Sequence, residues 1–227
     1  MTWPAGIVLT SWAYTWRTTP LHRRETVAHA AQEPDVPTVF PRGVSGEDVQ
    51  GHESGHGPVF HRRYRTRIRQ ARVSPEDLMS TIRSDLNQPA PTTFARFQKV
   101  LGQADGMAVG DEYVVRMPGP WDGPVRVIEL TPSSFRFATL KGHLEAGQIE
   151  FRVGGGGHHE LQFEIESRSR SSDWLSDLLY DHLRMAKEVQ LHMWISFLEG
   201  VVALSGGRMT GGVDIDTTKI KDAPDGR

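Results

Sequence analysis

The chain has 227 residues, a formal net charge of -2 and no cysteine. A charge so close to neutral argues against a general nucleic-acid binder, and the lack of cysteine excludes disulfides, thiolate zinc sites and a cysteine nucleophile. The 23 glycines and 14 prolines count against a long helical bundle. No run approaches the ~20 apolar residues of a membrane span. We therefore expect a soluble, cytoplasmic protein with one main domain.

The first 55 residues differ in amino-acid composition from the rest of the chain. Their start is crowded by large aromatic side chains, namely Trp3, Trp12, Tyr14 and Trp16. Exposing such side chains to water costs about 1.5–3 kcal/mol each. We expect residues 1–55 to form a partly irregular extension that packs on the main domain, with a short helix around residues 24–32.

Residues 58–70 alternate arginine with less polar side chains, and this period of two predicts a strand with one cationic face. The alternating arginines are Arg63, Arg65, Arg67 and Arg69. We expect this strand to pair with the last strand of the sheet, which would place Arg65 and Arg67 beside Glu164 and Glu166. That pairing explains the cationic face without an anionic ligand.

Two short helices are expected next. Ser74 and Pro75, followed by two acidic residues, are typical of a helix start, and Leu78, Met79, Ile82 and Leu86 follow at helical spacing. A second short helix is expected from the spacing of Phe94, Phe97, Val100 and Leu101, with its end at Gly102.

A run of alternating segments separated by short turns follows, which indicates an antiparallel meander. We expect its five strands at residues 113–117, 125–130, 135–137, 149–153 and 161–165.

The last predicted element is one long helix over about residues 172–204, ended by Gly206-Gly207. Near its end, over residues 191–202, the helix is apolar around most of its circumference and must be covered on two sides. The sheet could cover one side, and the N-terminal segment or a second subunit in a homodimer could cover the other. We expect residues 56–207 to form the domain and residues 208–227 a C-terminal tail.

This order of elements, with the motif from Thr139-Leu140 through Gly142-His143, Glu145 and Gly147 to Phe151-Arg152-Val153, and then Glu164 to Arg170, resembles an uncharacterised branch of the START/polyketide-cyclase-like (SRPBCC) superfamily. The resemblance covers roughly residues 109–207. It implies an α+β helix-grip (START/Bet v-like) fold, in which a curved antiparallel sheet wraps a long C-terminal helix, with two short helices after the first strand.

The resemblance also implies a cavity between the sheet and the helix, which relatives use for lipids, polyketides, hormones or other apolar small molecules. We expect inward-pointing side chains to line it, namely Tyr113, Phe137, Phe151, Phe163, Met193 and Trp194. His143 and Glu145 are candidate catalytic residues or polar contacts at the cavity mouth, because histidine titrates near neutrality and a carboxylate can orient it. A surface ion pair in a turn is the other interpretation of these two residues.

Three function classes stay open, since a fold does not decide between them. The first is binding of an apolar or amphipathic small molecule in the cavity. The second is an enzyme of cyclase, dehydratase or hydrolase type that uses His143, and the third is a self-association or protein-interaction module. We expect no cofactor and no nucleic-acid partner.

One metal-site pattern occurs. His52-Glu53-Ser54-Gly55-His56 matches the HExxH sequence, in which two histidines on one helix face bind zinc. Gly51, Gly55, Gly57 and Pro58 disfavour a helix here, so we interpret the match as chance and expect no metal.

Overall fold

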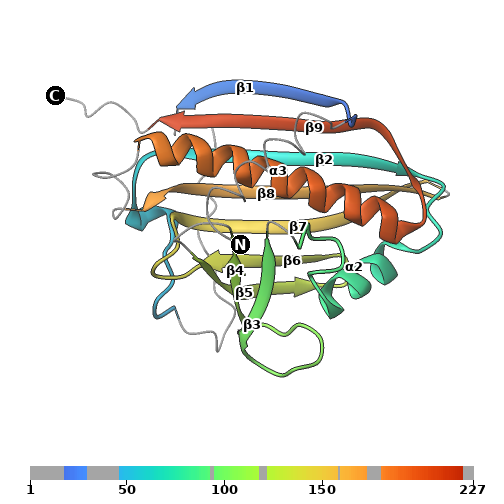
Figure 1. Cartoon of the computed structure of the whole chain (residues 1–227), viewed down its shortest axis with the longest axis horizontal. Helices are drawn as coiled ribbons and strands as arrows, with labels where there is room; N and C mark the ends of the chain where they lie inside the picture. Colours follow the sequence, from blue (N-terminus) through green and yellow to red (C-terminus); the bar gives the residue numbers. More distant parts are fainter. Residues whose placement is uncertain are drawn as a thin grey trace.

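The computed structural model describes residues 18–29, 46–92, 95–117, 122–157, 159–172 and 180–221. In this part of the chain a nine-stranded sheet has the order β1-β9-β2-β8-β7-β6-β5-β4-β3. Figure 1 shows α3 (Tyr180–Ser205) lying across one face of the sheet, with the shorter α2 (Pro75–Ser84) near its C-terminal end. The prediction of a mostly antiparallel sheet packed on a long, late helix is confirmed.

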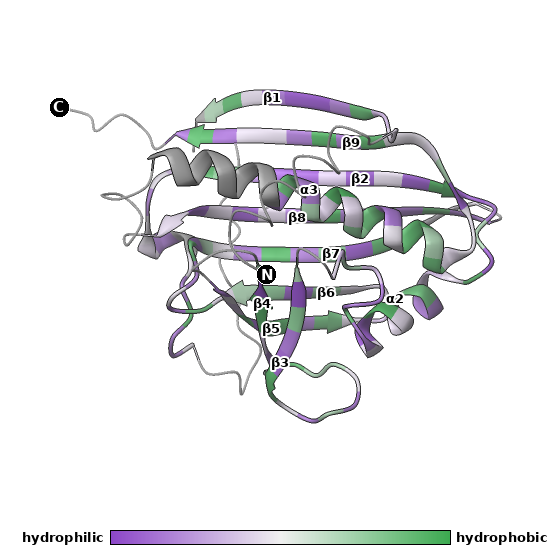
Figure 2. Ribbon diagram, viewed as in Figure 1, coloured by the Kyte–Doolittle hydropathy of each residue, from purple (hydrophilic) through white to green (hydrophobic). Residues whose placement is uncertain are grey.

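The strands are β1 (Leu21–His29), β2 (Gly55–Arg69), β3 (Arg96–Leu101), β4 (Glu112–Arg116), β5 (Asp122–Thr131), β6 (Ser134–Thr139), β7 (Glu145–Gly157), β8 (Glu160–Ser172) and β9 (Arg208–Lys221). The five expected meander strands correspond to β4 through β8. Hydrophilic and hydrophobic residues alternate along several strands in Figure 2, as expected where one face is buried.

β2 pairs with β8 in nearly the predicted register. Arg65 lies opposite Glu164, as expected, whereas Arg67 lies opposite Gln162 and Glu166 lies opposite Arg63. Tyr64, Thr66 and Ile68 of β2 are buried, so the predicted alternation is confirmed.

α2 begins as its sequence predicts. Ser74 is the N-cap, and its hydroxyl accepts a hydrogen bond from the backbone N–H of Asp77 at 3.1 Å. The buried face consists of Leu78, Met79 and Ile82.

The expected second short helix is wrong over residues 96–101, because these residues form β3. They pair with β4, from Arg96 opposite Arg116 to Leu101 opposite Glu112. The side chain of Asn87 supports the extended backbone, since it accepts from the N–H of Phe97 at 2.8 Å and donates to its carbonyl at 2.9 Å. Tertiary pairing therefore outweighs the local helical spacing.

Two further predictions are wrong at the edge of the sheet. Residues 24–29 belong to strand β1, not to a helix, and residues 208–221 form β9, not a tail. β9 pairs with β2 on one side and, in parallel, with β1 on the other. Its buried Val213 and Ile215 extend the core, which gives the strand its apolar face. The N-terminal aromatic residues and residues 30–32 lie outside the described part of the chain.

The apolar side chains at the end of α3 are buried by the chain itself. Its buried residues include Leu191, Trp194, Ile195, Leu198 and Val202. The connection after α2 approaches the helix so closely that a Cβ at Gly200 would lie 2.2 Å from the carbonyl oxygen of Pro89. Gly206, with φ of +65°, ends the helix as predicted. A second subunit is not needed to cover this face, and the homodimer stays a prediction.

Of the helices in the described ranges, none combines the length and the hydropathy needed to cross a membrane.

Candidate functional site

The six side chains expected to line a cavity belong to one buried hydrophobic cluster. The ring of Phe151 stacks on Phe135 at 4.6 Å between centroids and meets Trp194 at 5.5 Å and Phe197 at 5.4 Å. Tyr113 contacts the ring of Phe137 at 5.7 Å. The structure thus brings the predicted residues together, in contact with one another under the C-terminal half of α3.

The face of the sheet under α3 changes character toward the N-terminal end of the helix. One row of paired residues across β7, β8, β2 and β9 consists of Phe151, Ile165, Tyr64 and Ile215. The next row consists of Ile149, Ser167, Arg62 and Thr217. The row after that consists of Gly147, Ser169, Phe60 and Lys219. The sheet therefore passes from large apolar side chains to small and charged ones within two rows.

A polar cluster marks this change. The Arg62 Nη1 atom lies 3.1 Å from Oε1 of Glu145, and the side-chain amide of Gln190 on α3 donates to Oε2 of Glu145 at 3.1 Å. The Arg62 side chain is only 8% exposed and that of Glu145 is 23% exposed. The Arg62 guanidinium also lies 4.9 Å from the ring centre of Phe60. Strand β2, strand β7 and helix α3 meet through these three polar side chains.

The charges of the cluster are fixed by their neighbours. Burial by itself raises the pKa of Glu145, but the positive charge of Arg62, the influence of His143 and the hydrogen bonds from Gln190 and Arg62 bring this pKa below its usual value. Burial lowers the pKa of His143, against the opposing effect of Glu145. At neutral pH the cluster therefore holds an ionised carboxylate beside a neutral imidazole.

His143 contacts Glu145 through the main chain of Glu145. The Nδ1 atom of His143 lies 2.9 Å from both the backbone nitrogen and the backbone oxygen of Glu145. The position of the ring proton decides which of these bonds forms. The Nε2 atom faces β5, where a Cβ at Gly123 would lie 3.1 Å away. An imidazole with Nδ1–H bonded to the carbonyl would keep Nε2 as a proton acceptor.

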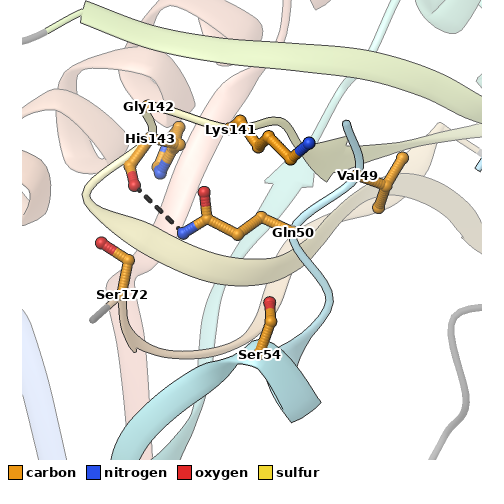
Figure 3. Close-up of a pocket in the computed structure, with 7 residues that line it drawn as sticks. All are labelled: Val49, Gln50, Ser54, Lys141, Gly142, His143 and Ser172. Carbon is orange, nitrogen blue, oxygen red and sulfur yellow. Dashed lines mark hydrogen bonds between the residues drawn. The ribbon is translucent and has the colours of Figure 1, made fainter. Parts of the chain in front are cut away.

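A pocket of about 460 Å³ lies between the β6–β7 turn and the segment that precedes β2. It is lined by Val49, Gln50, Ser54, Lys141, Gly142, His143 and Ser172 (Figure 3). The side-chain amide of Gln50 donates to the backbone oxygen of His143 at 3.4 Å. The segment before β2 is held against the end of β6, because the N–H of Gln50 donates to the carbonyl of Thr139 at 2.8 Å.

The hydroxyl of Ser172 in this pocket has no hydrogen-bond partner in the described structure, although the residue is only 4% exposed. Leaving a buried hydroxyl unpaired costs about 1–3 kcal/mol. The sequence reasoning missed the pocket because its lining residues come from three segments far apart in the chain, namely 49–54, 141–143 and the end of β8.

The opposite face of the sheet carries a network of ion pairs centred on Glu166. His61 Nε2 lies 2.5 Å from Oε1 of this carboxylate, and Arg152 Nη1 lies 2.8 Å from Oε2. The hydrogen bond from His61 is the largest influence, and it and Arg152 outweigh burial to lower the pKa of Glu166 to about 2. This carboxylate is therefore a structural group.

Glu166 is expected to contribute to acid sensitivity. Because its folded pKa lies below the value of the unfolded chain, its contribution of up to about 3 kcal/mol is present above pH 4.5 and is lost as the pH falls toward 2. Glu166→Gln should lower stability at pH 7 and flatten the loss between pH 4.5 and 2, as measured by urea unfolding. The control Glu160→Gln, at the half-exposed end of β8, should keep the wild-type slope. Identical slopes for all three proteins would contradict the assignment.

The HExxH match is not a zinc site in the described structure. Residues His52–Ser54 form one 3-10 turn, and His56 already belongs to β2. No group of three or more metal-ligating side chains occurs among the described residues. The extended backbone from Gly55 onward prevents the two histidines from sharing a helix face.

Comparison with solved structures finds similar chains at low identity. A norcoclaurine synthase point mutant from Thalictrum flavum is 10% identical, with 65% of this chain and 98% of that chain covered and a TM-score of 0.45. Major latex-like protein 151 from Panax ginseng is 15% identical, with 66% and 99% covered and a TM-score of 0.45. The di-domain ARO/CYC StfQ of the steffimycin biosynthetic pathway is 9% identical, with 68% and 53% covered and a TM-score of 0.47.

No curated protein matches the sequence. A family model matches residues 26–197, which run from within β1 to within α3 and include the polar cluster and the pocket. The chain therefore belongs to the family described as "Domain of unknown function (DUF1990)".

Proposed function

We propose that the protein binds an amphipathic small molecule between the sheet and the N-terminal half of α3. The observation that carries this proposal is the buried cluster of Arg62, Glu145 and Gln190 next to the aromatic core. An ion pair in such a place is a poor device for stability, because desolvating two charges offsets their attraction. A polar cluster at an inward-facing position is better explained by recognition of a polar group.

The small residues in two rows of the sheet support the same position for the ligand. Ser167 and Ser169 are buried where Ile165 and Phe163 continue the core on the same face of β8. Small side chains under a helix fill less space than large ones, and ligand sites in proteins are mostly apolar with a few convergent polar groups. A ligand would contact Phe151 and Trp194 with its apolar part.

The ligand's polar group would lie at Glu145 and Gln190. Gln190 and Trp194 are separated by one helical turn, so they present adjacent polar and apolar contacts on one side of α3. Tyr113, Phe137, Phe163 and Met193 complete the proposed apolar wall behind Phe151. Arg62 and Glu145 neutralise each other, which leaves hydrogen bonding as the main polar contribution.

A space-filling variant tests this proposal. Ser167→Leu would occupy the ligand's position, so we expect it to abolish saturable binding of the uncharged amphipathic fluorophore 6-propionyl-2-(dimethylamino)naphthalene while the urea midpoint stays at or above the wild-type value. The control Gln162→Leu, on the exposed face of the same strand, should bind the fluorophore as the wild type does. Fluorescence titration and urea unfolding provide the two measurements.

A site without free space would give the opposite result for Ser167→Leu. If the space above Ser167 is already filled by protein, the added side chain would cost about 1–3 kcal/mol of stability. Such a loss, or a wild-type protein that does not bind the fluorophore saturably, would contradict the proposal.

An enzyme of cyclase, dehydratase or hydrolase type is a second candidate because His143 is neutral at the edge of the same cluster. A base needs a free ring nitrogen, which requires the proton on Nδ1. Imidazole ¹⁵N chemical shifts that place the proton on Nε2 would exclude this role.

A further inference from the structure

The pocket behind the β6–β7 turn shares His143 with the polar cluster, but none of its lining residues belongs to α3. Its described walls come from the segment before β2, the β6–β7 turn and the last residue of β8 (Figure 3). At about 460 Å³ it has the volume of about fifteen water molecules, at about 30 Å³ each. It is large enough for a small organic molecule.

The buried hydroxyl of Ser172 is the observation that points to a ligand. The residue is 96% buried, it lines the pocket, and no described group bonds to its Oγ atom. Its backbone N–H is already used, since it donates to the carbonyl of Leu144 at 3.1 Å. The hydroxyl can both donate and accept, so a group that does the same would satisfy it best.

The other residues that line the pocket indicate which ligand charge the pocket can accept. The ammonium group of Lys141 pairs with Asp48 at 2.9 Å, so the cation is neutralised within the protein. The hydroxyl of Ser54 donates to the carbonyl of Gly51 at 2.7 Å, which leaves its oxygen as an acceptor. The pocket therefore offers hydrogen-bonding groups without an uncompensated charge, which disfavours a phosphate or a carboxylate.

We propose that this pocket binds an uncharged, hydroxyl-bearing small molecule of polyol type, with one ligand hydroxyl bonded to Oγ of Ser172. The Gln50 side chain, which spans the pocket to the carbonyl of His143, forms the facing wall. This site does not rest on the proposed function, because none of its walls belongs to α3.

The test uses the full-length, ¹⁵N-labelled protein titrated with glycerol, glucose and myo-inositol, and separately with sodium phosphate at constant ionic strength. We expect glucose or myo-inositol to shift the amide resonances of Gln50, Ser54, Lys141 and Gly142 saturably. Ser172→Ala should weaken this binding about 3- to 10-fold, which is the worth of one hydrogen bond. The control Ser171→Ala, at the neighbouring half-buried serine, should bind with the wild-type affinity.

Stability of the free variant separates a ligand contact from a structural role. Without polyol, Ser172→Ala should unfold at the same or a higher urea concentration than the wild type, because it removes an unpaired buried hydroxyl. A lower midpoint would mean that the hydroxyl serves the fold through an ordered water, and it would overturn the proposal. So would the lack of saturable shifts with every polyol, tighter binding of phosphate, or equal affinities of wild type and Ser172→Ala.

Discussion

Phe151→Ala is expected to lower the free energy of unfolding by about 3–5 kcal/mol, as large-to-small changes of buried aromatic residues do. The ring is 1% exposed and contacts Phe135, Phe137, Trp194 and Phe197. Its removal would leave a cavity where the middle of the sheet meets α3. Urea unfolding followed by circular dichroism measures the change.

A matched control for this variant lies on the edge strand β3. Val100 is 50% exposed, so Val100→Ala should change stability by less than about 0.5 kcal/mol. A loss below about 1 kcal/mol for Phe151→Ala would show that the aromatic cluster is loosely packed, contrary to the contacts described above.

Arg62→Met is expected to cost about 3 kcal/mol, because it leaves the carboxylate of Glu145 without its ion-pair partner in a mostly buried position. The double variant Arg62→Met/Glu145→Leu should recover most of this loss, since replacing both charges by apolar groups removes the unpaired charge as well. Urea unfolding of the wild type, the two single variants and the double variant gives the coupling free energy.

The neighbouring arginine provides the control for this cycle. Arg63 is half-buried and points to the opposite face of β2, so Arg63→Met should have a much smaller effect. Strictly additive losses in the double variant would mean that Arg62 and Glu145 do not stabilise each other. A stable double variant that no longer binds the amphipathic fluorophore would separate the cluster's role in binding from its role in folding.

Sequence patterns were sufficient where local signals and tertiary contacts agree. Ser74 and Pro75 start α2 through local capping. The alternation of arginine and less polar residues around Tyr64 predicts the same buried and exposed faces that β2 has in the sheet. The patterns failed where pairing with a distant strand decides the outcome. Residues 96–101 have helical spacing but become extended because β4 and Asn87 supply hydrogen bonds to them.

The edge of the sheet was missed for a related reason. In β9, residues such as Asp214 and Asp216 alternate with Val213 and Ile215, but the run is rich in polar residues and resembles a tail. Its burial depends on β1 and β2, which lie on either side of it and far away in sequence.

The site was only partly predictable. The motif indicated His143 and Glu145, since both belong to one short turn. Arg62, however, lies 83 positions from Glu145, and Gln190 lies 45 positions from it on a different type of element. The residue pattern within β2, β7 or α3 alone cannot indicate a contact that joins all three elements.

The position of β9 between β1 and β2 has a consequence for how the sheet assembles. Among the described strands, β1 pairs only with β9, which follows α3 in the chain, so β1 cannot join the sheet until β9 has formed. Until then β2 presents an open row of backbone donors and acceptors, a surface prone to pairing with other chains. A chain interrupted before residue 208 would leave β1 unpaired and this side of β2 open, so it should aggregate.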